Sequence, residues 1–204
     1  MVSSVISRLN DRRDAAADLG EDAGFTLIEL MVVLLILAIL LAIAIPTFLG
    51  VTGGANDRSA QSNLNTALTA VKTQATQLGQ SYTGITTTLM STAEPSISWA
   101  TGTQTSGTVS TQGPVSFYVS TDGNGIVLAS FSKSTGNCWY AVDNLSTVTT
   151  TSNGPYVTAG NGTAGSVPTT AGTWYGEVKG AASCNASGVP TFQAGWAANY
   201  TGIS

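Results

Sequence analysis

The sequence predicts an α+β fold in which one long N-terminal helix packs on a small antiparallel β-sheet. Three observations lead to this prediction. Residues 30–45 are sixteen consecutive apolar residues. The segment 55–78 then repeats apolar residues at intervals of three and four, the period of an amphipathic helix. Beyond residue 81, short β-prone runs alternate with turns rich in Gly, Ser and Asn.

The composition excludes several classes of function. The chain has 204 residues, a net charge of -4, two cysteines and no histidine. Residues 25–204 contain only Arg58, Lys72, Lys133 and Lys179 as cations, too few to follow a phosphate backbone, so nucleic acid is not expected as a main partner. Without histidine, neither a His/Cys metal site nor a Ser-His-Asp triad can be built. We therefore expect a protein without cofactor, metal or catalytic residues that is not an enzyme.

The apolar run is long enough to cross a membrane. Residues 25–49 would form roughly 37 Å of helix, against a hydrocarbon core about 30 Å thick. The run is apolar on every face, so one stripe packed on a soluble core does not explain it. The alternative is a secretory signal peptide cleaved at Ala42-Ile43-Ala44, although such a segment is usually shorter and would not contain Glu29.

The distribution of arginines predicts the orientation of this span. Arg8, Arg12 and Arg13 precede the run, and only Arg58 follows it closely. Because positive charge favours the cytoplasmic side, the N-terminus should stay inside and the C-terminal part should be exported. We expect a single-pass protein of the cytoplasmic membrane.

The beginning of the run resembles the N-terminus of a type IV prepilin. A polar leader, residues 1–24, is followed by "FTLIEL", a long apolar helix and a proline at its far end. The resemblance covers roughly residues 18–80, and its matching residues are Gly24, Phe25, Thr26, Leu27, Ile28, Glu29, Leu30 and Pro46. It implies that a prepilin peptidase cuts between Gly24 and Phe25 and methylates the new Phe25 amine. Two features depart from the family pattern: "EDAG" lacks the usual Lys or Arg before the glycine, and the leader is long, as in prepilins of some Gram-positive bacteria.

Glu29 is the single charge in the span, and cleavage suggests a role for it. The cut would create an α-ammonium on Phe25, four residues away. A carboxylate in the first turn is favoured by the helix dipole, and its cost in the bilayer, about 2.5–3.5 kcal/mol at the centre, falls near the end. In a bundle of identical helices the neutralising ammonium can belong to a neighbour, and leaving either charge unpaired is strongly destabilising. We interpret Glu29 as an assembly contact that sets axial register; the alternative is a solvated carboxylate at the membrane edge.

The helix is expected to change character after the membrane. Pro46 lacks the N–H that would bond to the carbonyl of Ala42, which predicts a kink. Residues 50–80 should form an exported amphipathic helix lying against the following domain. Its predicted apolar stripe consists of Ala60, Leu64, Ala67, Leu68, Val71, Ala75 and Leu78.

Residues 81–204 are expected to form an exported Ser/Thr/Gly-rich β domain. The runs 115–120, 126–132 and 138–143, separated by "DGNG" and "STGN", predict a three-stranded antiparallel meander. Residues 173–179 should add a fourth strand and 96–99 a weaker one, while 145–172 should be a long surface loop. In the first of these strands, Val115, Phe117 and Val119 should share one face.

The two cysteines lie on the exported side in this topology. Oxidising conditions there favour a bond between Cys138 and Cys184. The pair resembles the disulfide-bounded C-terminal region of type IV pilins; two free thiols are the alternative. Asp122 and Asn124 could suggest calcium ligands, but a hairpin turn explains them better.

The sequence thus favours a structural pilin subunit that polymerises through its N-terminal helix into a type IV pilus, with roles in motility, adhesion or DNA uptake. The expected partners are identical subunits, a prepilin peptidase, the pilus assembly machinery and, before assembly, membrane lipid. A pseudopilin of a type II secretion or competence system is the main alternative. A membrane-anchored adhesive module that never polymerises is a third, which would need neither Gly24 nor Glu29.

Overall fold

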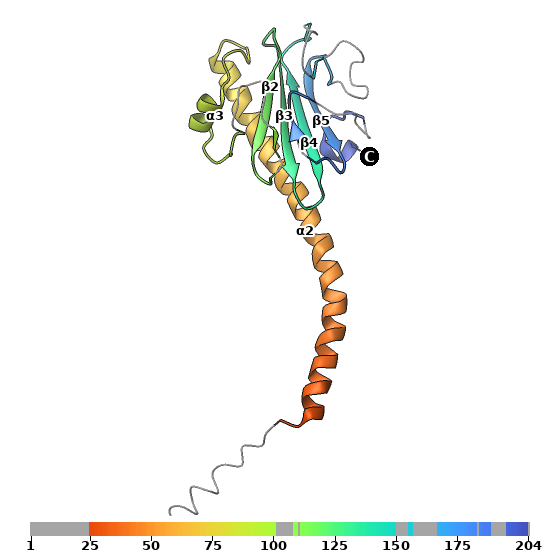
Figure 1. Cartoon of the computed structure of the whole chain (residues 1–204). Coiled ribbons are helices and arrows are strands. Elements are labelled where there is room, and N and C mark those ends of the chain that lie inside the picture. The colour runs from red at the N-terminus through yellow and green to blue at the C-terminus, as the bar shows by residue number, and fades with distance from the viewer. Residues whose placement is uncertain are drawn as a thin grey trace, which may run out of the picture. The chain divides into compact units, whose positions relative to one another are not determined.

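The computed structural model describes residues 25–100, 108–109, 111–149, 155–156, 167–182, 184–188 and 195–203. The chain divides into two compact units, residues 1–47 and 48–204. The elements, shown in Figure 1, are α2 (Leu27–Gln77), α3 (Thr87–Ala93), β1 (Thr108–Val109), β2 (Val115–Val119), β3 (Gly125–Ser132), β4 (Asn137–Asn144), β5 (Gly172–Val178), β6 (Cys184–Asn185) and a 3-10 turn at Tyr200–Gly202. The predicted α+β class is confirmed.

Helix α2 combines both predicted helical stretches in 51 continuous residues. It continues through Pro46 and the glycines that follow, so neither ends the helix, although Pro46 itself cannot donate to the carbonyl of Ala42. The kink expected at Pro46 stays a prediction. The helix ends near Gly79, whose φ of +77° is the left-handed conformation that commonly terminates helices.

The second unit contains the predicted antiparallel meander. The sheet order is β2-β3-β4-β5, and each strand pairs antiparallel with its neighbour, so the meander and its fourth strand are confirmed. The β2–β3 turn requires glycine at Gly123, where φ is +71° and a Cβ would lie 2.2 Å from Thr83 Oγ1. The weaker strand predicted at 96–99 is wrong: only Trp99 pairs, in an isolated bridge to Val115.

The core between α2 and the sheet follows the predicted periodicities. The stripe residues of α2 that are buried are Ala60, Leu64, Ala67, Leu68, Val71 and Ala75. They pack in one cluster with Val115, Phe117 and Val119 of β2, which share a face as expected. Leu78 does not belong to the stripe, because it follows the last helical residue and is 40% exposed.

The opposite face of the sheet is buried as well, which the sequence did not predict. Side chains from this face form a second cluster with residues outside the sheet: Val109, Tyr118, Val127, Ala129, Phe131, Cys138, Tyr140, Val142, Val148, Tyr156, Val167, Val178, Cys184 and Ala186. The expectation of a surface loop at 145–172 is therefore wrong for Val148, Tyr156 and Val167, each at most 3% exposed. Their apolar side chains cover a sheet face that would otherwise meet water.

Three small elements are additional to the prediction. Helix α3 begins after Thr86, whose side chain accepts a hydrogen bond from Leu89 N at 3.2 Å, an N-cap. Strands β1 and β6 form a two-residue antiparallel pair, and the 3-10 turn places Tyr200 against Trp139. All three are too short to give a periodic signal.

Candidate functional site

The predicted assembly residues lie at the start of α2. Thr26 immediately precedes the helix, and Glu29 is in its first turn. Glu29 Oε2 accepts hydrogen bonds from Thr26 N (2.9 Å) and Thr26 Oγ1 (2.8 Å). In return, Thr26 Oγ1 accepts a bond from Glu29 N (3.2 Å). This reciprocal pattern is a capping box, which satisfies backbone donors that a helix start leaves without partners.

The capping box uses one of the two carboxylate oxygens of Glu29. Oε2 accepts both bonds from Thr26, and no described residue donates to Oε1. Phe25 is 88% exposed beside it. Gly24, the expected cleavage residue, lies outside the described residues.

Sequence reasoning missed the part played by Thr26. It named Thr26 only as part of the family pattern and interpreted Glu29 only through charge pairing. The signal was present as T-x-x-E directly before an apolar run, the signature of a capping box. Glu29 therefore has a local structural role that does not depend on any neighbour.

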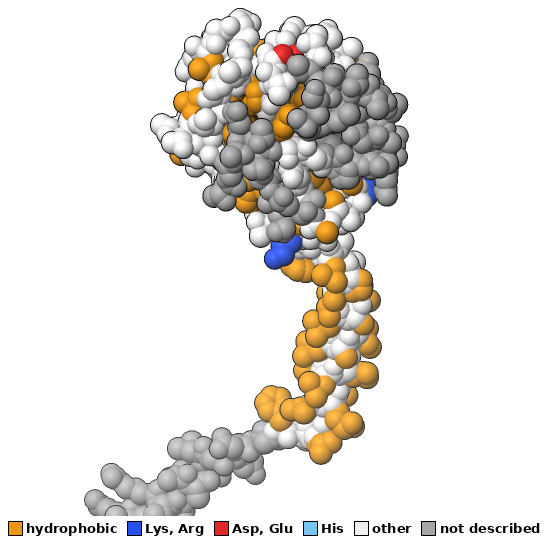
Figure 2. Space-filling view, turned by 45° about the horizontal axis from the view of Figure 1, so that its top comes forward, with side chains coloured by type: hydrophobic (Ala, Val, Ile, Leu, Met, Phe, Trp, Pro, Cys, Tyr) orange, Lys and Arg blue, Asp and Glu red, His pale blue; other side chains and the backbone are white. Residues whose placement is uncertain are grey.

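The surroundings of Glu29 are apolar. Its side chain lines a shallow groove with Phe25, Leu30, Val33 and Leu34. The large apolar residues from Phe25 to Val51 are all exposed, and Figure 2 shows their orange side chains covering this stretch. Among the described residues, α2 is the one helix long and apolar enough to cross a membrane. Such a surface is stable only in lipid or against other apolar helices.

The helix has an additional local feature after Pro46. The hydroxyl of Thr47 donates to the carbonyl oxygens of Ile43 (3.2 Å) and Ala44 (2.9 Å). A hydroxyl that bonds back to the preceding turn has no need of another polar partner, which lets threonine sit in an apolar helix.

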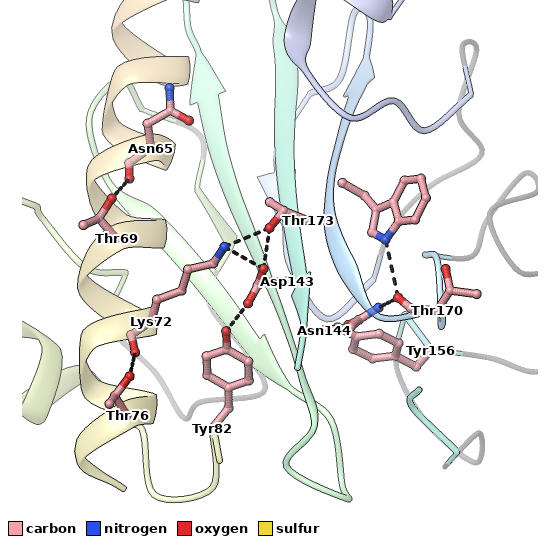
Figure 3. Close-up of polar contacts among 11 residues, drawn as sticks. Asn65, Thr69, Lys72, Thr76, Tyr82, Asp143, Asn144, Tyr156, Thr170 and Thr173 are labelled. Carbon is pink, nitrogen blue, oxygen red and sulfur yellow. Dashed lines mark hydrogen bonds and ion pairs between the residues drawn. The ribbon is translucent and has the colours of Figure 1, made fainter. Parts of the chain in front are cut away.

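A polar cluster in the second unit connects α2 to the sheet (Figure 3). Lys72 Nζ lies 2.8 Å from Asp143 Oδ1 and donates to Thr173 Oγ1 at 2.8 Å. Thr173 Oγ1 donates to Asp143 Oδ1 at 2.5 Å, and Tyr82 OH donates to Asp143 Oδ2. Burial, reinforced by Asp143, raises the pKa of Tyr82 well above its usual range. Both oxygens of Asp143 are occupied by these donors, so the cluster fastens the helix to β4 and β5.

Asp122 is a turn residue, as the sequence predicts. Its Oδ1 accepts bonds from Ser120 Oγ (2.6 Å) and Asn124 N (3.1 Å), and its Oδ2 accepts one from Thr149 N (2.9 Å). Burial alone would raise the pKa of Asp122, but these hydrogen bonds outweigh it and hold the pKa below its usual value. Within the part of the chain that the structure describes, no three potential ligands gather to hold a metal ion.

The burial of Glu177 leads us to predict that this carboxyl group makes the folded state less stable as pH rises. It is 6% exposed, and burial raises its pKa above the usual value, which Lys179 partly offsets. The native state therefore binds the proton more tightly than the unfolded chain. The stability contributed by protonated Glu177 is complete below the unfolded pKa and is lost as pH rises through the folded pKa. We expect Glu177→Gln to raise the melting temperature more at pH 7 than at pH 4.

Asp122→Asn is the matched comparison for this prediction. Because the folded pKa of Asp122 is lowered, its stabilisation is present at neutral pH and is lost as pH falls. Asp122→Asn should thus cost more at pH 7 than at pH 3, opposite in sign to Glu177→Gln. Thermal unfolding of the purified full chain in detergent, across this pH range, measures both. Identical pH profiles for wild type and Glu177→Gln would contradict the assignment.

The two cysteines are joined in a disulfide. Cys138 on β4 and Cys184 on β6 have Cα atoms 5.4 Å apart, are fully buried and are separated by 46 positions. Closing a loop of this length contributes on the order of 4 kcal/mol in the chain-entropy model. The bond holds the β1–β6 pair on the sheet face that is remote from α2.

We expect loss of this bond to weaken the second unit while leaving the apolar helix able to enter a membrane. Cys138→Ser should be less abundant, and its second unit should be digested faster by protease. Non-reducing peptide mapping of the wild type should show the two cysteine peptides linked. Two alkylatable thiols in the purified protein, or equal protease resistance in the variant, would contradict the prediction.

Comparison with known proteins identifies one segment of the chain. Residues 21–45 match the family model described as the prokaryotic N-terminal methylation motif. The match includes Phe25 and the two capping-box residues, Thr26 and Glu29, and ends just before Pro46. No curated protein and no solved structure matches the chain. The chain therefore carries the leader signature of type IV prepilins, which supports a type IV pilin-like or pseudopilin protein.

Proposed function

We propose that the mature chain begins at Phe25 and polymerises through α2 into a type IV pilus on the cell surface. The observation that most supports this is the combination of an exposed apolar helix, from Phe25 to Val51, with one carboxylate fixed in its first turn. A simple membrane anchor needs the apolar length, but an uncharged glutamine could cap the start of its helix equally well.

The energetics of the bilayer indicate why that charge matters. Apolar helices gain little hydrophobic free energy from each other in lipid, because lipid tails are equally apolar. Contacts among the residues of 27–51 can therefore hold packed subunits without determining their axial offset. A carboxylate that must meet an ammonium does determine it, since either charge left alone in the bundle is strongly destabilising.

The capping box fits this proposal. It orients Glu29 Oε2 toward Thr26 and leaves Oε1 without a described partner. Peptidase cleavage after Gly24 would supply the cation as the N-methylated amine of Phe25. A neighbour's amine can then bind Oε1 while the helix start stays capped.

The proposed route begins in the cytoplasmic membrane with the N-terminus inside. Arg8, Arg12 and Arg13 favour that orientation, because positive charge is retained on the cytoplasmic side. A prepilin peptidase and the pilus assembly machinery would then act in turn, and the subunit would leave the bilayer for an extracellular filament.

Examination of sheared cell surfaces tests the proposal. Electron microscopy should show filaments, and mass spectrometry should identify this chain in them, with an N-terminal peptide that starts at methylated Phe25. If the processed chain is found only in membranes, in cells that secrete proteins or take up DNA, the pseudopilin is favoured. Unprocessed chain on the surface without filaments would favour the anchored adhesive module.

A further inference from the structure

The four cations of residues 25–204 are unevenly distributed over the second unit. Lys72 is paired with Asp143, near the end of β4. Arg58, Lys133 and Lys179 are exposed, and none forms an ion pair within the described ranges. Lys133 directly follows β3, whereas Asp143 pairs with Ile126 near the beginning of β3. Lys72 and Lys133 therefore lie at opposite ends of the sheet.

Hydrogen bonds made by neighbouring residues place Lys179 and Arg58 at the same end of the sheet. Lys179 precedes Gly180, whose N–H donates to Asn137 Oδ1 at 3.3 Å. Asn137 Nδ2 donates in turn to Asp57 Oδ2 at 3.4 Å, and Asp57 precedes Arg58.

Lys133 joins the same end through a single side chain. Its backbone N–H donates to Gln112 Oε1 at 3.0 Å, and Gln112 Nε2 donates to the carbonyl oxygen of Asn56 at 3.1 Å. We call Arg58, Lys133 and Lys179 the cationic end. Figure 2 shows blue side chains at the margin of the domain.

Two acidic residues share this region, but neither is exposed, since Asp57 is half-buried and Glu177 is buried. Asp57 Oδ1 accepts bonds from Thr135 Oγ1 (2.6 Å) and Trp139 Nε1 (3.3 Å). Glu177 is buried, and the positive charge of Lys179 partly offsets the rise in its pKa that burial causes. Arg58 and Lys133 thus remain as exposed positive charges, with Lys179 beside them.

The cationic end directly follows apolar surface on the same unit. Phe48, Leu49 and Val51 are all at least 65% exposed. Arg58 comes nine residues after Leu49, about 13 Å along the helix. A cation at this distance from an apolar segment can reach the headgroups of a bilayer, where anionic lipid attracts it.

We propose that the cationic end lies against anionic lipid headgroups of the exported leaflet while the subunit waits in the membrane. The proposal rests on the membrane insertion proposed above. Anionic lipid would hold the unpolymerised domain close to the bilayer, and release into a filament would break these contacts. Each cation should change the ratio of lipid-bound to free domain about fivefold.

Acetylation of lysines in the reconstituted full chain tests this. The chain is inserted into vesicles of phosphatidylcholine alone or with phosphatidylglycerol, and only the co-floating fraction is labelled and mapped by mass spectrometry. With phosphatidylglycerol, Lys133 and Lys179 should label several-fold more slowly, and high salt should restore their rates. Lys72, paired at the opposite end, is the internal control and should not change.

Arg58→Gln separates lipid binding from general shielding. It removes one cation without removing either labelled lysine, so protection of Lys133 and Lys179 should fall by up to about fivefold. Equal labelling in both kinds of vesicle overturns the proposal. So does protection that appears only in sheared filaments, which would identify a second copy as the occupant. A chain that does not float with vesicles would overturn membrane insertion as well.

Discussion

Glu29→Leu should enter the membrane at least as well as the wild type and yield no filaments. Insertion improves because a charge is removed from the span, a gain of at most about 2.5–3.5 kcal/mol. Assembly fails because the neighbour's Phe25 ammonium would enter an apolar bundle without a counter-charge, a loss of about 3–5 kcal/mol for a buried pair. Cleavage after Gly24 should continue, although methylation of Phe25 is expected to fall. The measurement is filament yield relative to the membrane pool.

The capping box makes a sharper comparison possible. Glu29→Gln keeps an oxygen that can accept from Thr26 N but removes the charge, so it preserves the helix start and abolishes the pair. We expect it to resemble Glu29→Leu. Thr26→Ala keeps the charge and loses the hydroxyl cap, at a cost of about 1 kcal/mol, and should still polymerise. Glu29→Asp should be intermediate, because its carboxylate has a shorter reach.

These variants separate two roles of one carboxylate. If Glu29→Gln forms normal filaments while Thr26→Ala does not, capping rather than charge is what assembly requires. Normal filaments from Glu29→Leu at normal pool levels would exclude the charge pair altogether.

Gly24→Val should leave a full-length, membrane-bound precursor and no filaments. A peptidase that cuts after a residue without a side chain has no room for a branched one at that position. The uncut chain also keeps the Phe25 nitrogen as a neutral amide, so it cannot supply the ammonium for Glu29. Intact mass and N-terminal sequencing measure the outcome. Ala23→Val, one position earlier, is the matched control and should be processed.

The wild-type terminus distinguishes the two forms of processing. A mature chain that begins at Phe25 agrees with prepilin cleavage. A start at Ile45 or Thr47 would instead indicate ordinary signal peptidase acting near Ala42-Ile43-Ala44, and the predicted role of Glu29 would be lost with the removed segment.

The sequence by itself determined the elements that repeat over many residues. Sixteen uninterrupted apolar residues and a 3.6-residue period each give a signal that is summed over several turns. This is why α2 and its buried stripe, except Leu78, were predicted correctly. Strands β2, β3, β4 and β5 were predictable because β-prone runs alternate with glycine-containing turns. The leader signature is equally local, since its spacing is fixed along the chain.

Only the tertiary structure decided what covers the second face of the sheet. Val148, Tyr156 and Val167 lie far apart in a Ser/Thr/Gly-rich stretch with few other apolar residues, so no window around them has a period. The contacts of Asp143 were likewise not predictable from the sequence. Asp143 contacts Lys72, 71 positions earlier, and Thr173, 30 positions later. Such contacts depend on where distant segments meet after the sheet has formed. They are set by burial and hydrogen bonding in three dimensions, and not by any pattern among neighbours in the chain.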